Sequence, residues 1–223
     1  MSAIPTPPSP LPAELTGPLA ALGMQRTHKR RHEFLFHMGD PVYDRFYAID
    51  SGYWKCGTVS LDGEQDVIAF HGKGGYLGLD ELHAERRSYS AVALSNSTVL
   101  EFPIGRVLQA AEQDEALRQQ LQTLLLQEIG RQHRIAQIQR STRARQKIAA
   151  FLLELASMES AGGPPVPYFR LPMSRTDIAA FLGLGDTTVS REFQHLTQSG
   201  GISVQGRWLS VLDASQLQRE AGQ

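Results

Sequence analysis

The chain contains a single cysteine, Cys56, among 223 residues. One thiol cannot form a disulfide within the chain, and it cannot build a metal site from cysteines alone. No apolar run reaches the roughly 18 residues that span a membrane, and the proline-rich residues 1–12 do not resemble a secretory signal. These absences predict a cytoplasmic protein without a membrane segment or an internal disulfide.

An excess of charge is also lacking, because the formal net charge is −1. With 41% hydrophobic and 20% charged residues, the composition is that of a globular protein, and the length leaves room for two modest domains. Since the chain as a whole is not basic, any contact with nucleic acid has to come from local basic patches.

The motifs of common enzymes are absent as well. The sequence has no GxxxxGK[ST] phosphate loop, and Gly72-Lys73-Gly74-Gly75 is interpreted as a turn because it lacks a strand–loop–helix context. Asp80-Glu81 is a pair of carboxylates with no nucleophile or base pattern beside it. We therefore expect no enzymatic activity, no catalytic residues, no metal site and no cofactor.

Glycine and proline are scarce between Arg106 and about Ser141, where only Gly130 occurs. This stretch predicts one long helix. Its first apolar face consists of Leu117, Leu121, Leu124, Ile135 and Ile138. A second seam, at alternating spacings of three and four, consists of Gln122, Leu125, Ile129, Gln132, Ala136 and Gln139. Heptad spacing of this kind favours pairing with a second chain, so we predict a homodimer through this seam; the alternative is a buried helix of a monomer.

What the sequence has in abundance, from Phe34 to Pro103, is short strand-like runs between turn signals. The runs are Phe46 to Asp50, Tyr53 to Ser60, Asp66 to Phe70, Ser90 to Ala93 and Thr98 to Phe102. Evenly spaced short strands predict a β-sandwich or jelly roll. Asp62-Gly63 is the strongest hairpin signal among the turns.

The segment from Ser174 to Leu196 has the pattern of a helix-turn-helix. Ser174 and Asp177 fit a capping box, and Gly183-Leu184-Gly185 breaks the segment into two helices. The second helix, at about 186–197, buries Val189, Phe193 and Leu196. Its opposite face is polar and can reach base edges in a major groove. An ordinary helical hairpin with a solvated face is the alternative.

Two features flank this segment. Arg140, Arg143, Arg145 and Lys147 form a basic run that leads into a helix from Gln146 to Met158. After the recognition helix, Ile202 to Val204 and Trp208 to Leu212 predict a β-hairpin, or wing, with Arg207 at its tip as a phosphate contact. The predicted DNA-binding residues are Arg175, Thr187, Thr188, Ser190, Arg191, Gln194 and Arg207.

The predicted fold class is therefore α+β. A proline-rich tail and short helix (1–22) precede a jelly-roll-like β-roll (23–105), a long dimerisation helix (106–143) and a winged helix-turn-helix domain (144–223).

This order of parts resembles the cyclic-AMP receptor protein and fumarate–nitrate regulator (CRP/FNR) family of bacterial transcription regulators. The resemblance covers nearly the whole chain after about Leu15. The segments closest to the FNR branch are Gly63-Glu64-Gln65, Leu117-Arg118-Gln119-Gln120, Phe181-Leu182-Gly183-Leu184 and Thr188-Val189-Ser190-Arg191. The resemblance implies a dimeric, sequence-specific DNA-binding regulator with a cyclic-nucleotide-binding-like domain, which binds a pseudo-palindromic promoter site and works with RNA polymerase.

The chain departs from the family at its sensory residues. Iron–sulfur members hold their cluster with about four cysteines, and here Cys56 stands alone. Cyclic-nucleotide members bind ribose through a glutamate after a glycine, where this chain has Gly78-Leu79, and Arg87-Ser88 lies two residues earlier than the family's phosphate-binding pair. We therefore expect neither a cluster nor cyclic-nucleotide binding, and the residues identify no small-molecule effector.

The histidines and the recognition face leave other interpretations open. Haem-dependent members exist, so His71 or His83 could ligate haem, although a surface or hydrogen-bonded histidine is the commoner case. On the recognition face, Thr187 replaces a family glutamate, so the outer base pair of the half-site is read differently or not at all.

The alternative functions are a ligand- or haem-sensing regulator of this architecture and a partner-binding β-roll protein whose helix-turn-helix is only structural.

Overall fold

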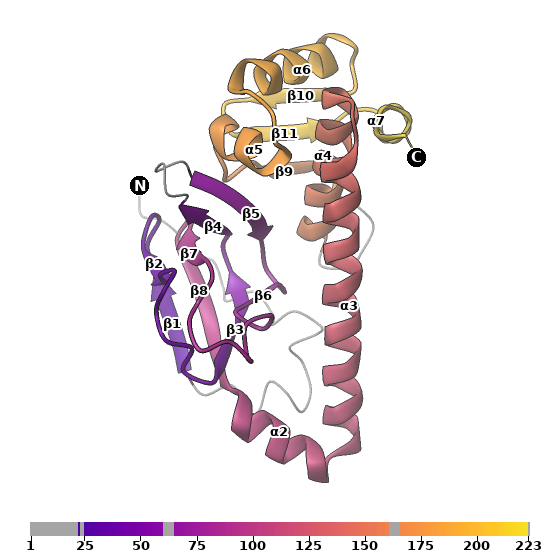
Figure 1. Ribbon diagram of the computed structural model, residues 1–223. Coiled ribbons are helices and arrows are strands. Elements are labelled where there is room, and N and C mark those ends of the chain that lie inside the picture. The colour runs from indigo at the N-terminus through magenta and orange to yellow at the C-terminus, as the bar shows by residue number, and fades with distance from the viewer. Residues whose placement is uncertain (1–21, 23–24, 60–64, 161–165, 223) are drawn as a thin grey trace, which may run out of the picture.

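A computed structural model of the chain describes residues 22, 25–59, 65–160 and 166–222. A β-roll lies beside the long helix α3, and a helical domain with a small sheet sits at one end of both (Figure 1). The predicted fold class is confirmed. Residues 1–21, which contain the predicted proline-rich tail and most of the short helix, and the Asp62-Gly63 turn fall outside the described residues. Within the described part, no helix has the length and apolar character to cross a membrane.

The β-roll consists of two four-stranded antiparallel sheets. One sheet has the order β1 (Gln25–Lys29), β8 (Ser97–Pro103), β3 (Arg45–Ser51), β6 (Tyr76–Leu77), and the other has the order β2 (Phe34–Phe36), β7 (Ser90–Ala93), β4 (Trp54–Val59), β5 (Gln65–His71). The five predicted strand runs are β3, β4, β5, β7 and β8, whereas β1, β2 and β6 were not predicted. Trp54, Phe46 and Phe102 are fully buried between the sheets and the helices.

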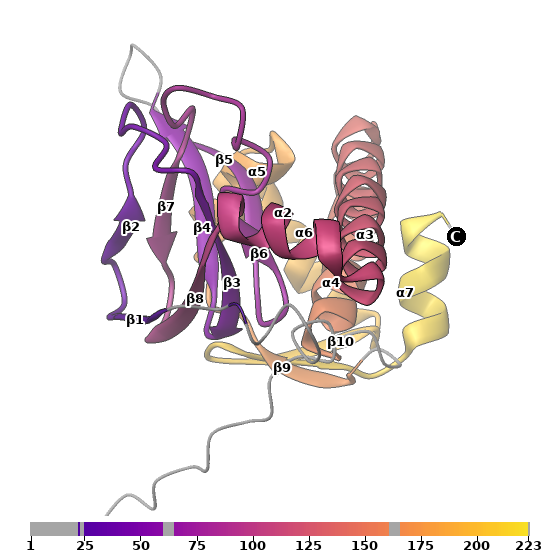
Figure 2. The same ribbon diagram turned by 90° about the horizontal axis from the view of Figure 1, so that it is seen from below.

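The prediction of one uninterrupted helix from Arg106 to Ser141 is wrong. The chain forms two helices, α2 (Ile104–Gln113) and α3 (Glu115–Arg140), and α2 crosses from the β-roll to α3 (Figure 2). Asp114 has extended backbone angles, and its carboxylate accepts hydrogen bonds from the backbone N–H groups of Ala116 and Leu117. Because an aspartate N-cap satisfies N–H groups that the first turn leaves unpaired, Asp114 begins a new helix.

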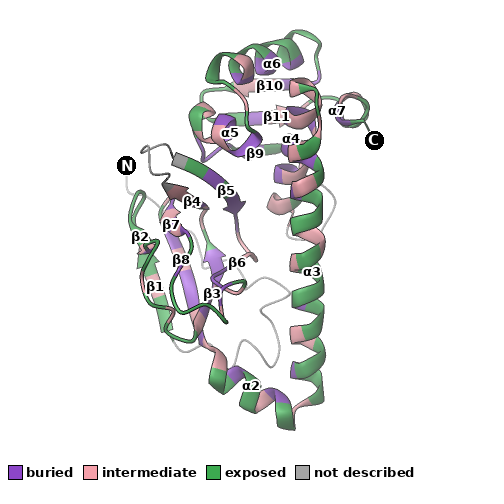
Figure 3. Ribbon diagram, in the orientation of Figure 1, coloured by how far each residue is buried: buried purple, intermediate pink, exposed green. Residues whose placement is uncertain are grey.

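The first apolar face of α3 packs as predicted. Leu117, Leu124, Ile135 and Ile138 are buried, and Leu121 is half-buried. Much of the remaining helix surface is exposed along its length (Figure 3). The helix therefore uses one face within the chain and leaves another uncovered.

The C-terminal domain follows from α4 (Ala144–Glu159). It contains α5 (Arg175–Leu182), α6 (Asp186–Gln198), α7 (Ala214–Ala221) and a sheet of order β10 (Ile202–Gln205), β11 (Trp208–Val211), β9 (Tyr168–Arg170). The predicted helix-turn-helix and wing hairpin are α5–α6 and β10–β11. The sequence did not predict β9 or α7, which begins at Asp213, where the side chain caps the N–H of Gln216.

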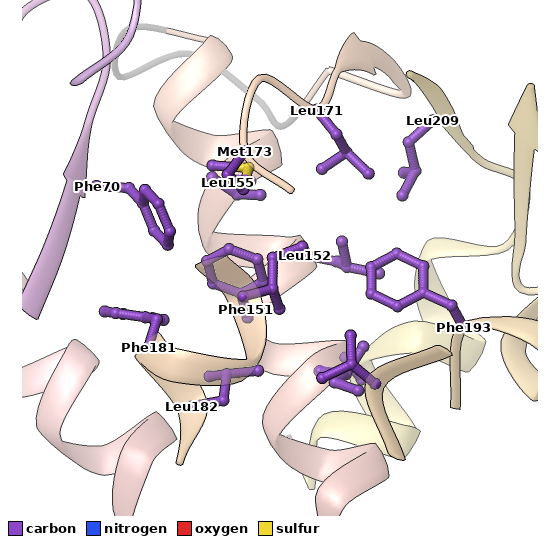
Figure 4. Packing of buried hydrophobic residues seen from close by; sticks show 14 of the residues in the cluster. Phe70, Phe151, Leu152, Leu155, Leu171, Met173, Phe181, Leu182, Phe193 and Leu209 are labelled. Carbon is purple, nitrogen blue, oxygen red and sulfur yellow. The ribbon is translucent and has the colours of Figure 1, made fainter. Parts of the chain in front are cut away.

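One hydrophobic core joins the β-roll to this domain. Phe70 of β5 packs against Phe181 of α5 at a ring-centroid distance of 5.2 Å, and both contact Phe151 of α4 (Figure 4). Beside these rings, Lys55 Nζ of β4 forms an ion pair with Asp177 Oδ1 of α5 at 2.5 Å. The first helix of the helix-turn-helix is thus fixed directly to the β-roll.

Candidate nucleic-acid interface

The helix-turn-helix is built by local signals at both ends of α5. The Ser174 side chain accepts from the N–H of Asp177, and the Asp177 carboxylate accepts from the N–H of Ser174, so the predicted capping box is confirmed. Gly183 ends the helix at φ +62°, a left-handed conformation that glycine adopts without a Cβ clash. The turn then delivers the chain to α6 at Gly185.

The two faces of α6 differ as predicted. Val189, Phe193 and Leu196 are buried, while the polar face formed by Thr187, Ser190, Arg191 and Gln194 is exposed and Thr188 is half-buried. Helix α6 lies at the end of the molecule away from α2 (Figure 1). The structure therefore brings the predicted recognition residues together on one uncovered helix face.

A buried carboxylate lies directly behind this face. Glu192 is 8% exposed, and its Oε2 accepts a hydrogen bond from Arg145 Nε of α4 at 3.0 Å. Its Oε1 accepts from Arg191 Nε at 3.4 Å. Burial opposes ionisation of Glu192, but Arg145 and Arg191 outweigh it and lower the pKa of this carboxyl. Sequence analysis missed Glu192, although a glutamate beside the apolar stripe of an amphipathic helix is a recognisable signal.

Arg175 occupies a different position from the other candidates. Its guanidinium lies 3.3 Å from the centre of the Phe193 ring, and burial lowers its pKa to about 10. A guanidinium over an aromatic face is stabilised electrostatically. Next to it, Thr176 Oγ1 donates to Asp186 Oδ2 at 2.8 Å, which ties the start of α5 to the start of α6.

The wing presents Arg207 at the hairpin tip. Gly206 at φ +62° makes the tight turn between β10 and β11. Arg207 is exposed, and its Nη1 donates to the carbonyl oxygen of Pro172 at 3.1 Å. This bond holds the tip next to the start of α5.

The predicted dimer seam divides into two parts. Gln122, Leu125, Ile129 and Gln132 are exposed, with Leu125 at 50% and Ile129 at 53%. Leu126, which sequence analysis left out, is 69% exposed beside them. Farther along, Ala136 and Gln139 are half-buried, and Gln139 Nε2 donates to the carbonyl oxygen of Phe181 at 2.9 Å. Gln139 is therefore engaged within its own chain.

Inside the β-roll, the guanidinium of Arg87 is enclosed by partners from its own chain. Arg87 is 4% exposed, lies 4.4 Å from the Phe36 ring centre, and forms an ion pair with Glu81 at 3.4 Å. Ser88 donates through both N and Oγ to Glu81 Oε1. A Cβ on Gly78 would lie 2.4 Å from Arg87 Nη1, so this glycine leaves room for the guanidinium.

The nearby space is small. A cavity of about 100 Å³ between the β-roll and α3 is lined by residues that include Cys56, His71, Tyr89 and Gln132. Pockets for drug-sized ligands occupy roughly 300–1,000 Å³, so this cavity by itself is too small for a nucleotide or haem. An open hollow of about 250 Å³ adjoins it at His71, Tyr76 and Glu128. Burial raises the pKa of the Cys56 thiol, and no cluster of three or more potential ligands occurs within the described residues. The donor set does not fit an iron–sulfur cluster.

A β-roll, a long helix with an exposed seam and a winged helix-turn-helix together define a DNA-binding regulator. Residues 26–114 match the model of the cyclic nucleotide-binding domain, and residues 146–220 match that of the Crp-like helix-turn-helix domain.

Two transcription regulators are similar in sequence to most of this chain. The transcriptional activator protein anr of Pseudomonas aeruginosa is 35% identical over 86% of this chain and 79% of that protein. The transcriptional regulatory protein btr of Bordetella pertussis is 32% identical over 96% of this chain and 88% of that protein. The structure of FixK2 from Bradyrhizobium japonicum has the same fold, with a TM-score of 0.75 at 23% identity over 87% of this chain and 96% of that chain. The chain belongs to the CRP/FNR family and is a transcription regulator with a helix-turn-helix DNA-binding domain.

Proposed function

We propose that the protein acts as a homodimer that binds a pseudo-palindromic promoter site through α6 and contacts RNA polymerase there. The observation that carries the proposal is the exposed polar face of α6 opposite its buried apolar stripe. Arg191 is the residue on this face that can bind guanine O6 and N7 in a bidentate way. Its side chain is 72% exposed.

The seam on α3 supports the dimer. Leu125, Leu126 and Ile129 are large apolar side chains, each at least half exposed on one helix. Pairing two such helices in parallel buries them and places two recognition helices in adjacent major grooves, about 34 Å apart. Arg207 then contacts a phosphate from the wing, and Thr187, Thr188, Ser190 and Gln194 contact bases or phosphates beside Arg191.

The filled interior of the β-roll supports regulation without cyclic nucleotides. Arg87 is bound to Glu81, and the enclosed cavity of about 100 Å³ is by itself too small for a nucleotide. We propose that the protein binds DNA equally well in air and under anaerobic conditions, that added cyclic AMP leaves binding unchanged, and that it acts in the cytoplasm without enzymatic activity.

A selection experiment tests the DNA-binding proposal. The purified chain is mixed with a library of randomised duplexes at about 150 mM salt, and bound duplexes are sequenced. We expect enrichment of a two-fold symmetric site with a guanine in each half. Recovery of duplexes without a common motif would overturn sequence-specific recognition.

The dimer has its own test. Ile129→Glu places like charges at the paired helices and should weaken both self-association and DNA binding, whereas Gln127→Glu changes charge equally at another exposed position of α3. Light scattering of the wild-type chain that showed a DNA-competent monomer would contradict the dimer.

A further inference from the structure

The basic run at the junction of α3 and α4 divides into two pairs. Arg145 is bound to Glu192, and Lys147 Nζ donates to the carbonyl oxygen of Leu182 at 2.7 Å. Arg140 and Arg143 are exposed, and neither side chain forms a hydrogen bond or ion pair with any residue that the structure describes. The two outer arginines therefore present uncompensated charge to solvent.

The junction is fixed against the helix-turn-helix. The carbonyl oxygens of Phe181 and Leu182 lie in the last turn of α5, where the helix offers them no N–H partner. They accept hydrogen bonds from Gln139 Nε2 and Lys147 Nζ, which lie on either side of the junction. Figure 1 shows the end of α3 beside α6 at the same end of the molecule. Arg140 and Arg143 are thus held close to the recognition helix.

The direction of Arg140 follows from helix geometry. It lies eleven residues after Ile129 and four after Ala136, so at 100° per residue it projects from the same side of α3 as the exposed seam. In a parallel pair of α3 helices, the two Arg140 side chains lie near the dimer axis, and each Arg143 follows three residues later at the start of α4. The carboxylates of Glu192 and Glu220 already face Arg145, and that of Glu154 faces Arg134.

We propose that Arg140 and Arg143 bind the DNA phosphates over the centre of the site, between the two half-sites that α6 reads. The inference rests on the proposed homodimer. The two Arg140 side chains near the axis repel one another in the free dimer, and a polyanion across that axis neutralises them. DNA binding and dimer formation are coupled through these charges, which carry no base specificity.

Salt dependence tests the phosphate contact. Affinities of Arg143→Gln and of wild type are measured from about 50 to 300 mM salt on the selected site and on a scrambled duplex. Losing one contact per chain should lower the slope of log affinity against log salt by about two units per dimer, with the same factor for both duplexes. The control is Arg106→Gln, which removes the same charge from α2 at the opposite end of the molecule (Figure 1). An unchanged slope in Arg143→Gln would overturn the proposal.

The dimer affinity in the absence of DNA should change in the opposite direction to the DNA affinity. Without DNA, Arg140→Gln should tighten the dimer by roughly two- to fivefold, because it removes repulsion near the axis. The same substitution should weaken DNA binding. A dimer that is weakened or unaffected by Arg140→Gln would contradict the coupling. A monomeric wild-type chain that binds DNA would overturn the homodimer itself, which separates the two failures.

Discussion

Two arginines with similar chemistry have opposite surroundings in this molecule. Arg87 lies inside the β-roll, where Glu81, the Phe36 ring and two backbone carbonyls surround its guanidinium. Arg191 lies on α6 with its side chain 72% exposed and one long contact, to Glu192. The N–H donors of Arg87 are bound to groups of its own chain, so Arg87 contributes to the fold. Arg191 retains N–H donors that another molecule can accept from. The difference shows which of the two guanidinium groups has donors left for a partner: that of Arg191 on α6.

The largest expected effect comes from breaking the internal pair. Arg87→Ala leaves the buried Glu81 carboxylate uncompensated and should lower the free energy of unfolding by about 3–5 kcal/mol. Urea titration measures the loss. The double substitution Arg87→Met with Glu81→Leu removes both charges and should recover much of it. Equal destabilisation of the single and double variants would show that packing, and not the charge pair, matters here.

Arg191→Ala should leave folding unaffected and remove recognition. Loss of a bidentate guanine contact costs roughly 1–3 kcal/mol in each half-site, and the dimer uses the contact twice. Cognate affinity should therefore approach the non-specific background. Competition with a site whose guanine has been replaced provides the measurement. If cognate and scrambled duplexes lose affinity by the same factor, Arg191 contacts the backbone and our placement of the recognition helix is wrong.

His71 extends the comparison to pH. Burial, with a smaller contribution from Arg131, lowers its pKa well below the ordinary value of 6.5. At higher pH the imidazole is neutral in both states. Below about pH 6.5 the unfolded chain takes up a proton that the folded chain excludes, so stability should fall by up to about 1.4 kcal/mol per pH unit. Unfolding free energies at pH 7.5 and 5.5 should decline less in His71→Gln; an equal decline would contradict the assignment.

The smallest effect is expected at the wing. Arg207→Ala should weaken binding to all sequences about equally and lower the salt slope by about one unit per contact. In the unbound protein Arg207 Nη1 already donates to the Pro172 carbonyl oxygen. Fewer of its N–H donors are therefore available to a phosphate. Discrimination between cognate and scrambled duplexes should not change. A selective loss on the cognate site would assign base contact to Arg207.

Sequence patterns predicted the parts of the fold that local signals determine. The capping box at Ser174, the left-handed Gly183 and the alternating faces of α6 all arise from neighbouring residues. Strands β2 and β6 escaped prediction because three and two residues are too short to show a period, and β1 because its sequence, QRTHK, is polar throughout. The break at Asp114 had a local signal, an aspartate three residues before Leu117, which the helical run on both sides concealed.

Contacts between distant segments could not be predicted in this way. The Glu192–Arg145 pair and the Lys55–Asp177 pair join residues 47 and 122 positions apart, so their proximity depends on the whole fold. Arg87 and Glu81 are only six residues apart, but the segment between them is irregular. The sequence therefore showed the two-residue shift of Arg87 from the family position and not the carboxylate that it binds. The base and dimer contacts of the candidate residues stay predictions.

The shared core of Phe70, Phe151 and Phe181 has a mechanical consequence. The strand that carries Phe70 ends at His71, and the helix that carries Phe181 ends at the turn before α6. With interiors packed to crystal-like density, a displacement of one ring is passed on to its neighbours and not absorbed. We therefore expect a displacement of β5 to be passed through Phe70 and Phe181 to α5, and from α5 to the turn that leads into α6.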